Sequence, residues 1–460
     1  MSKPKEYASM TKDKLMTYTF VALLILAVIS AVMWSQVTPI DTLTQQPLMN
    51  LGLTVAIVCL IAVGVAVGTD FLLYKVVSDS PLNIMSAAVF GLIVALSYTL
   101  GVPNMALGAD AIGVSSAPGA FIYVALISFI GLVLFKKLIR KRVNPAAAAK
   151  LLVLLPFVGS ALLAKEHYAD FASGGLNVPL LAGPIGHTVL GNNGAIINGD
   201  NVIGSFVRYL QGCYGLPGTT TFTDVNWLMI VEKYHGWVGG ASSIAVIIVG
   251  IALFVLARRF IKWRITLAYF VSVALMALLL TAVYGGDADV RLLFSIFIGS
   301  SIFLGFFMAT DPATTPLTYN GQLIFGVGLG VMTVLIQTYM NFFGGSILAL
   351  VIMNLISPVL DKVGMMKPTT EKKEPKLPKA KQFTTVKTYD CMKCGACLRV
   401  CCHKLSPIYI KEAFDKTNVE KMAKLNADYC TGCGHCSYVC PSRIDLKGSV
   451  LRAKSMLRGN

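Results

Sequence analysis

Charged side chains are scarce in this sequence. Asp, Glu, Lys and Arg make up 13% of its 460 residues, whereas soluble domains usually carry about 25%. Hydrophobic residues make up 55%, and the mean hydropathy is +0.69. These values exclude a disordered chain, a collagen and a small disulfide-stapled secreted scaffold. They indicate a polytopic membrane protein.

The sequence also lacks the glycine-rich fingerprint of a nicotinamide-binding fold, so we do not expect this chain to oxidise NADH by itself. The net charge is +16, which by itself is compatible with nucleic-acid binding. However, Lys and Arg lie in short clusters at the ends of apolar runs, as membrane topology requires. We therefore expect membrane lipid, and no nucleic acid, among the partners.

Apolar runs of roughly twenty residues are long enough to cross about 30 Å of hydrocarbon. They predict an all-α membrane domain over residues 15–361 with ten transmembrane helices. The predicted spans are 15–35, 51–74, 82–100, 117–135, 147–164, 237–257, 263–284, 291–309, 321–339 and 342–361.

The distribution of Lys and Arg between the spans predicts the orientation. Loops 36–50 and 101–116 have neither residue, whereas the loops around 136–150 and 258–264 are strongly basic. Because basic loops stay inside, both termini, including residues 1–14, are predicted to be cytoplasmic. The chain would lie in a prokaryotic cytoplasmic (inner) membrane, with the long loop 165–236 outside.

The segment 362–388 contains eight lysines and three prolines. This composition is typical of a solvated linker. A spacer is the simpler interpretation, and contact with anionic lipid headgroups is the alternative.

Nine of the eleven cysteines lie between Cys391 and Cys440. They include two runs of four, each with gaps of two, two and three residues, and Pro441 follows the second run. In two-cluster ferredoxins with this spacing, three thiolates come from one tight turn and the fourth comes from the other run. The pattern predicts a ferredoxin domain at 389–460 that binds two [4Fe–4S] clusters.

In each predicted set of cluster ligands, the fourth cysteine comes from the other run. The first cluster would use Cys391, Cys394, Cys397 and Cys440, and the second would use Cys430, Cys433, Cys436 and Cys401. Apolar residues at helical intervals between Ile408 and Leu425 indicate a helical ferredoxin.

Zinc and disulfides are the alternatives for these cysteines. Zinc modules usually show paired two-cysteine knuckles rather than runs of four, and disulfides are disfavoured in a reducing cytoplasm. Cys402 stands where a proline usually follows the first run. It is interpreted as a spare thiol, and a ligand swap between Cys401 and Cys402 stays open.

The ferredoxin region resembles a known module. The stretch "CMKCGACLRVC…LSPIYI…AKLNADYCTGCGHCSYVCPSRIDL" is similar to the ferredoxin module of the C-type subunit of Rnf electron-transport complexes. Four membrane segments, at 86–103, 236–264, 305–331 and 351–362, resemble the D-type subunit of the same complexes. That D-type subunit is related to the B-type subunit of the sodium-pumping NADH:quinone reductase. The chain is therefore similar to a D-type membrane subunit fused to a C-type ferredoxin module.

This resemblance implies one-electron transport in a membrane oxidoreductase complex. Electrons from a cytoplasmic donor would pass through the clusters to a flavin in the membrane domain, coupled in the family to Na+ or H+ movement. The implied partners are other subunits of such a complex and a soluble donor, such as ferredoxin or an NADH-oxidising subunit.

The resemblance also implies a flavin site. Family members carry FMN joined by a phosphoester to a threonine in a Ser-Gly-Ala-Thr-Pro-Leu-like motif on the outer side. The nearest match, "LPGTTTF" at 216–222, puts Thr220 in the acceptor position. Pro217 and Thr219 replace the Ser and Ala of the motif, and Tyr214 stands where an aspartate is expected. Noncovalent FMN is the alternative, and Thr315 is a competing threonine on a cytoplasmic connection.

A second departure concerns ion coupling. Related subunits show Gly-Glu-Thr-Ser where this chain has Ala241 in place of the acid, in the sequence "GASS" at 240–243. Asp70, near the inner end of the second span, is the clearest intramembrane acid, with a functional and a structural interpretation both open.

Three functional hypotheses follow. The first is an electron-transfer subunit of an ion-translocating complex. The second is a membrane anchor or docking module whose clusters sense redox state, and the third is a flavin-dependent reductase of an external acceptor without ion coupling.

Overall fold

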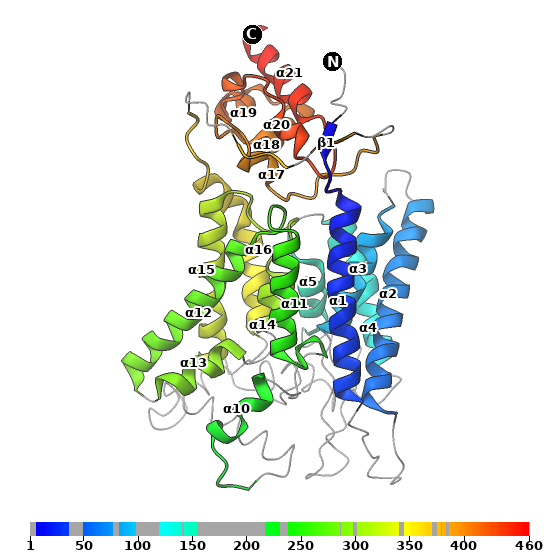
Figure 1. The fold of residues 1–460 in the computed structure, drawn as a ribbon, viewed down its shortest axis with the longest axis vertical. Helices are drawn as coiled ribbons and strands as arrows, with labels where there is room; N and C mark the ends of the chain where they lie inside the picture. The colour runs from blue at the N-terminus through cyan, green and yellow to red at the C-terminus, as the bar shows by residue number, and fades with distance from the viewer. Residues whose placement is uncertain are drawn as a thin grey trace.

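The computed structural model describes residues 6–35, 49–76, 82–97, 119–139, 142–154, 217–230, 238–285, 287–297, 301–339, 345–369, 375–378, 380–382 and 386–459. In Figure 1 a bundle of membrane helices lies beneath a smaller C-terminal domain, and both chain ends lie at the end of the molecule that this domain occupies.

Five described helices are long and apolar enough to cross a membrane. They are α1 (Lys12–Trp34), α2 (Leu51–Val76), α12 (Trp263–Tyr284), α15 (Tyr319–Tyr339) and α16 (Gly345–Val363). The helix α13 (Ala288–Phe297) and the segment 301–308, formed by α14 (Ser301–Phe303) and η4 (Leu304–Met308), meet at an angle of 62°. Counted as one bent span, they bring the total in the described part of the chain to six. The chain is thus a multi-pass membrane protein.

The ten predicted spans are shown only in part. Five of them correspond to the five long helices, and 291–309 corresponds to the bent pair. The spans 82–100 and 237–257 correspond to α3 (Ile84–Leu96) and α11 (Ser243–Leu256). At about 1.5 Å per residue, helices of this length cover only about 20 Å.

The remaining two predicted spans lie around the basic loop at 136–150. The span 117–135 is formed by α4 (Gly119–Ile130), which continues as the π-helical segment η2 (Gly131–Leu138). Helix α5 (Pro145–Leu154) covers the start of 147–164, and the rest of that span lies outside the described residues.

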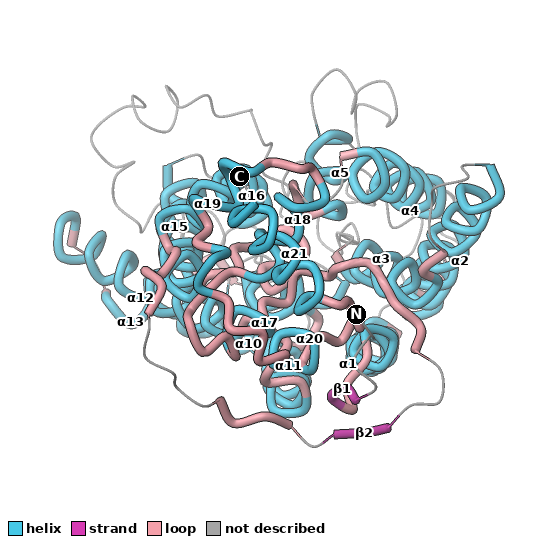
Figure 2. Tube along the Cα trace, turned by 90° about the horizontal axis from the view of Figure 1, so that it is seen from above, coloured by secondary structure: helices cyan, strands magenta, loops and turns pink. Residues whose placement is uncertain are grey.

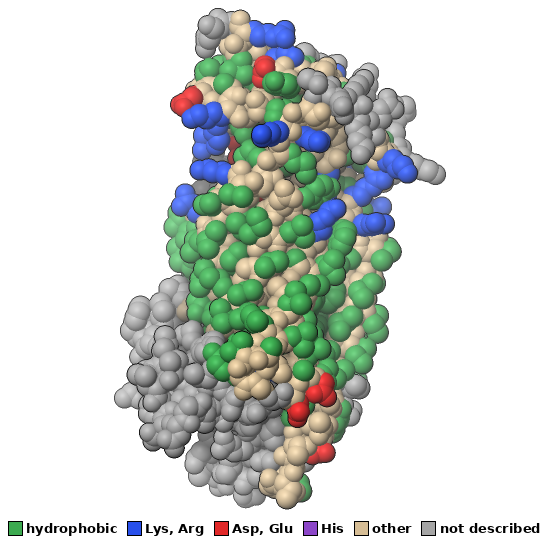
Figure 3. Space-filling view, turned by 90° about the vertical axis from the view of Figure 1, so that its left-hand side faces the viewer, with side chains coloured by type: hydrophobic (Ala, Val, Ile, Leu, Met, Phe, Trp, Pro, Cys, Tyr) green, Lys and Arg blue, Asp and Glu red, His purple; other side chains and the backbone are tan. Residues whose placement is uncertain are grey.

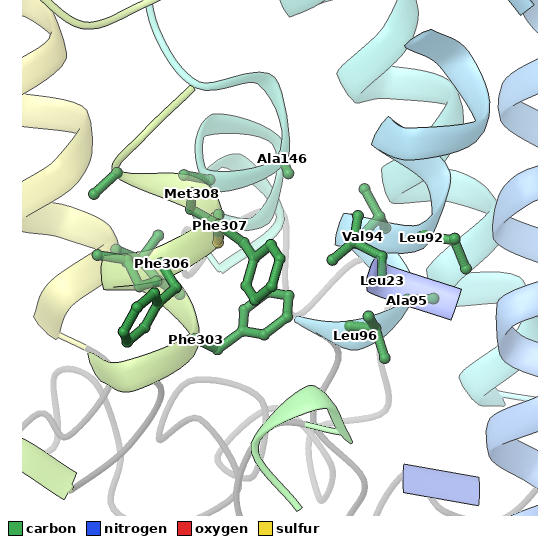
Figure 4. Close-up of a cluster of buried hydrophobic side chains, with 14 of the residues drawn as sticks. Leu23, Leu92, Val94, Ala95, Leu96, Ala146, Phe303, Phe306, Phe307 and Met308 are labelled. Carbon is green, nitrogen blue, oxygen red and sulfur yellow. The ribbon is translucent and has the colours of Figure 1, made fainter. Parts of the chain in front are cut away.

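The membrane helices pack closely around small residues. A side chain at Gly326 or Gly330 of α15 would collide with α12, since an added Cβ would lie 2.7 Å from Ala268 Cβ and 1.9 Å from Ser272 Oγ respectively. Figure 4 shows a central part of the core, where Phe303, Phe306 and Phe307 lie near Met308 and Ala146. Four residues of α3 lie to one side, namely Leu92, Val94, Ala95 and Leu96. The rings of Phe303 and Phe307 stack with centroids 5.3 Å apart.

The outer surface of the bundle is apolar, as lipid contact requires. Leu60, Val255 and Leu275 are among the most exposed of its large apolar side chains. On the face that Figure 3 shows, hydrophobic side chains form a broad band, with Lys and Arg gathered at the end that holds the C-terminal domain.

The C-terminal domain is built from short helices, as predicted. They are α17 (Ala396–Arg399), α18 (Pro407–Asp415), α19 (Val419–Lys424), η5 (Ala427–Tyr429), α20 (His435–Tyr438) and α21 (Leu446–Gly459). Pro407 starts α18, a position where its missing N–H is no loss. Figure 2, seen from above, shows these helices lying over the membrane helices rather than beside them.

Chain segments from both ends fasten this domain to the bundle. Strand β1 (Glu6–Ala8) pairs antiparallel with β2 (Ala380–Gln382) of the predicted linker. The N–H of Lys12 donates to Pro441 O at 3.1 Å, and Tyr389 Oη donates to Asp13 at 2.6 Å. In the linker, Lys376 O accepts from Arg259 of the membrane domain, and Pro378 O accepts from Tyr438 of the C-terminal domain. The described linker residues therefore contact both parts of the molecule.

Candidate functional site

Four cysteines of the C-terminal domain line one small cavity, here called site 1. They are Cys391, Cys394, Cys397 and Cys440. Gly395 adopts a left-handed backbone with φ of 74° immediately before α17, a conformation that costs glycine little. The turn folds the first run around the cavity, and Cys440 arrives from the second run.

The other four cysteines, Cys401, Cys430, Cys433 and Cys436, line a second cavity, here called site 2. Gly434, with φ of 84°, precedes α20 in the same way that Gly395 precedes α17. The structure thus brings together the same two sets of four thiols that the sequence spacing predicts.

The chemistry of the donor set fits a cluster at each site. Burial, and to a smaller extent the neighbouring thiols, raise the pKa of Cys436 and of Cys440 to about 12. Burial and the surrounding thiols also raise the pKa of Cys397 well above its ordinary value. Four such thiols can share a cavity as thiolates only if cations sit between them, which iron supplies. Backbone N–H groups of Lys393 and Leu405 point at the sulfurs of Cys391 and Cys401, at 3.4 and 3.3 Å.

Cys402 lines neither cavity. Its buried Sγ lies 3.4 Å from His435 Nδ1, and these two atoms and Cys433 Sγ all lie within 4.8 Å of one another. This trio could hold a metal ion, but only by using Cys433, which also lines site 2. Between Cys401 and Cys402, the geometry therefore favours Cys401 as the fourth thiol of site 2.

Site 1 lies directly against the membrane domain. Leu317, from the connection between η4 and α15, forms part of the wall of site 1 and packs with Cys397, Cys440 and Ile408. An added Cβ on Gly395 would lie 3.3 Å from Leu317 O. The membrane domain thus contributes a wall to site 1.

One buried carboxylate holds this contact in place. Asp361, near the end of α16, accepts the backbone N–H groups of Leu317 and Thr318 at 2.6 and 3.1 Å. Its other oxygen accepts the hydroxyl of Tyr409 on α18. Asp361 therefore joins the connection 309–319, the last membrane helix and the C-terminal domain.

A larger cavity, here called the lower cavity, begins beneath site 1. It has a volume of about 400 Å³ and lies among α1, α2, α3, η2 and the segment 306–314. Cys391 and Met392 of the site 1 loop belong to its lining, as do Phe90, Phe306 and Phe307. Site 1 and the lower cavity are therefore adjacent through the loop that carries Cys391.

The polar lining of the lower cavity contains the acid that the sequence singled out. Asp70 is 1% exposed and pairs with Lys137 at 2.7 Å, and it also accepts the N–H of Asn83 at 2.9 Å. Lys12 and Lys136 line the same cavity. Asp70 thus links α2 to η2 and to Asn83, the residue before α3.

The two candidate flavin threonines lie in different surroundings. Thr220 lies in the turn before α10 (Phe222–Ile230), at the end of the bundle opposite the C-terminal domain (Figure 1), and its hydroxyl donates to Pro217 O at 2.6 Å. Thr315 is 3% exposed, and its hydroxyl donates to Asp311 O and accepts from Lys262. Thr315 is therefore part of the packing near site 1, whereas Thr220 lies in a partly exposed turn.

The fold and the two thiol-lined cavities define a membrane-embedded redox protein with a ferredoxin-like domain. The model of the NQR2, RnfD, RnfE family matches residues 2–369, and that of a 4Fe-4S dicluster domain matches residues 390–444. The chain belongs to the NQR2, RnfD, RnfE family. The predicted resemblance is confirmed, and so is the dicluster domain.

Individual relatives match parts of the chain. The D-type subunit of the Na(+)-translocating ferredoxin:NAD(+) oxidoreductase complex of Acetobacterium woodii is 32% identical over 149 residues, 32% of this chain and 42% of that protein. The B-type subunit of the Na(+)-translocating NADH-quinone reductase of Chromohalobacter salexigens is 38% identical over 165 residues, 32% of this chain and 39% of that protein. The D-type subunit of the proton-translocating ferredoxin:NAD(+) oxidoreductase complex of Clostridium ljungdahlii is 24% identical over 348 residues, 73% of this chain and 89% of that protein. The first two matches thus span less than half of each relative.

Sequence reasoning missed the residues that place site 1 on the membrane domain. Asp361 and Leu317 lie in stretches that carry the family resemblance, but no spacing links either of them to Tyr409. The lower cavity had no signal in the sequence because its lining comes from at least five separated segments.

Serine substitution should separate the two adjacent cysteines. The full chain, purified without oxygen, should bind about eight irons, as two four-thiolate sites require. Cys401→Ser should bind about half as much iron because site 2 loses a thiolate, whereas Cys402→Ser should match the wild type. Iron and labile sulfide assays with EPR of the reduced protein measure this. Loss of a cluster only in Cys402→Ser would contradict the assignment.

Proposed function

We propose that this chain is an electron-transfer subunit of an Rnf/Nqr-type oxidoreductase complex. Its C-terminal domain accepts electrons from a soluble donor, and its membrane domain receives them and passes them to a flavin. The observation that supports this most directly is the shared wall between the two domains. Leu317 of the membrane domain lines site 1, and Cys391 of site 1 lines the lower cavity.

The difference in solvent exposure between the two sites supports a direction of electron transfer, from site 2 to site 1. Cys433 of site 2 is exposed, whereas three of the four cysteines of site 1 are buried. Clusters bound at the two sites would supply one-electron storage at low potential. Site 2 is the entry point in this proposal, and site 1 is the exit toward the membrane domain.

The charge beside site 2 favours an acidic donor. Lys447 is exposed and lines the cavity, and Lys454 donates to Cys430 O at 2.7 Å. Exposed positive charge attracts a negatively charged partner and orients it before contact. A soluble ferredoxin or an acidic face of an NADH-oxidising subunit fits this chemistry.

The flavin has two candidate positions. Covalent FMN at Thr220 would use a hydroxyl in a partly exposed turn at the far end of the bundle. A noncovalent flavin would fit the lower cavity, where aromatic side chains can contact its rings and Lys12 and Lys136 can face a phosphate.

The surroundings of Ala241 and Asp70 support an alternative function without ion coupling. Ala241 is fully buried where related subunits carry an acid, and Asp70 is paired with Lys137. Both features favour a flavin-dependent reductase of an external acceptor that moves no ion. Sodium- or proton-dependent turnover in the assembled complex separates this function from the ion-translocating one.

We infer that the C-terminal domain is cytoplasmic, because Lys and Arg gather at that end of the bundle. A phosphatase reporter, active only outside, fused after residue 180 should give activity. The same reporter after residue 380 should give none, and a fluorescent protein that folds only in the cytoplasm should show the reverse. Phosphatase activity of the fusion after residue 380 would reverse the orientation and exclude a cytoplasmic donor.

The electron route can be tested in the full chain with its cofactors bound. Reduced ferredoxin mixed with the wild type should reduce the flavin, visible as loss of its absorbance. Cys401→Ser should slow this by roughly tenfold or more, since site 2 needs all four thiolates to hold a cluster, and Cys402→Ser is the matched control. Equal rates in both variants would contradict entry through site 2.

Covalent attachment can be tested at two adjacent threonines. The wild type should give a fluorescent band on a denaturing gel, and Thr220→Val should abolish it, because a phosphoester needs the hydroxyl. Thr219→Val, in the same exposed turn, should keep the band, and peptide mass spectrometry locates the link. A protein that releases its flavin on denaturation would move the cofactor to a noncovalent site. A protein without any flavin would favour the anchoring or sensing function.

A further inference from the structure

Lys262, immediately before α12, is buried with neutral partners. Its side chain is 1% exposed. Its Nζ donates to Pro312 O at 2.9 Å, Thr315 O at 2.8 Å and Thr315 Oγ1 at 2.9 Å. These bonds use all three ammonium protons. Burial lowers the pKa of Lys262 to about 7, so its charged form is costly unless a negative charge, such as that of a cluster bound at site 1, lies nearby.

The nearby carboxylates do not pair with this lysine. Asp361 accepts the N–H groups of Leu317 and Thr318 and the hydroxyl of Tyr409. Asp311 accepts from Ala313 N and Thr314 Oγ1. Among the residues that the structure describes, neither forms an ion pair with Lys262.

Lys262 lies in a segment that packs against site 1. Phe260 and Ile261, the two residues before it, pack in one cluster with Met392 and Cys394 of the site 1 loop. The connection that Lys262 holds continues into Leu317, which lines site 1. Arg399 approaches the same place from α17, with its Nη2 3.3 Å from Cys394 O. Two cationic side chains thus lie beside the thiols of site 1, where positive charge favours the added electron of a reduced cluster.

Site 2 also has cations, but they lie at the surface. Lys447 is exposed and lines site 2, and Lys454 is half-buried and donates to Cys430 O at 2.7 Å. Ions in solution screen exposed charges, whereas a buried charge is screened much less. The field of Lys262 is therefore screened less than that of Lys447.

We propose that Lys262, together with Arg399, makes site 1 the more readily reduced of the two cluster sites and so directs electrons toward the membrane domain. Each transfer moves one electron, by which site 2 is oxidised and site 1 is reduced, and no bond forms or breaks. In this proposal Lys262 acts through its charge on the reduction potential of site 1 and is not itself a ligand of the cluster. The inference rests on the proposed function, because it needs a cluster at each site.

The test is an EPR-monitored redox titration of the full chain in detergent. The Cys401→Ser background, which keeps only the cluster of site 1, assigns the signals. Lys262→Gln keeps a donor for the same carbonyl groups without the charge, and it should lower the midpoint potential of site 1 only. Lys262→Arg restores the charge and should return that potential close to the wild-type value. Lys447→Gln, which removes a surface charge, is the control and should shift the potential of site 2 less, with an effect that salt weakens.

The outcomes are distinct. An unchanged site 1 potential in Lys262→Gln overturns the inference. Equal shifts in Lys262→Gln and Lys262→Arg also overturn it, since they would show that Lys262 only supports the packing of the connection. A higher potential at site 2 than at site 1 in the wild type overturns the proposed direction. Absence of both cluster signals from the wild type would overturn the proposed function as well, and so is distinguishable from failure of the inference alone.

Discussion

The carboxylate of Asp361 is the contact on which the arrangement of this molecule depends. It lies near the end of the last membrane helix, is 6% exposed, and accepts hydrogen bonds from the connection 309–319 and from Tyr409 of the C-terminal domain. Hydrogen bonds to a buried charge are among the stronger ones, at about 1.5–3 kcal/mol each. This junction, together with the packing of Leu317 on Cys397 and Ile408, holds the connection against site 1.

Further contacts hold the two domains together. The strand β1 pairs with β2, and the N–H of Lys12 donates to Pro441 O. In the proposed function, a separate ferredoxin would have to bind the membrane domain anew for each electron, whereas a fused one stays in place. Cys433 of site 2 is exposed, whereas three of the four cysteines of site 1 are buried. One covalent chain thus gives site 2 and site 1 different surroundings, and buried charge such as that of Lys262 adds to the difference.

Sequence reasoning predicted the local features and missed the long-range ones. The cysteine spacing predicted both sets of four thiols, because three members of each set lie within seven residues of one another and the crossing of the fourth follows a general rule. Hydropathy predicted the long helices α1, α2, α12, α15 and α16, whereas α3 and α11 are too short in the described residues to count as spans. The pairing of Asp361 with Tyr409 joins positions 48 residues apart. No periodicity or motif encodes such a contact, and the same holds for the cavity lined by Asp70, Phe306 and Cys391.

The most direct test of the account is a cryo-EM structure of the full chain with its clusters bound, prepared without oxygen in a lipid nanodisc. The account predicts two strong iron densities. One should lie among Cys391, Cys394, Cys397 and Cys440, in contact with Leu317, and the other should lie on the solvent side near Cys433. A C-terminal domain that is detached from the connection 309–319, or turned so that the solvent-side cluster faces the membrane, would contradict it.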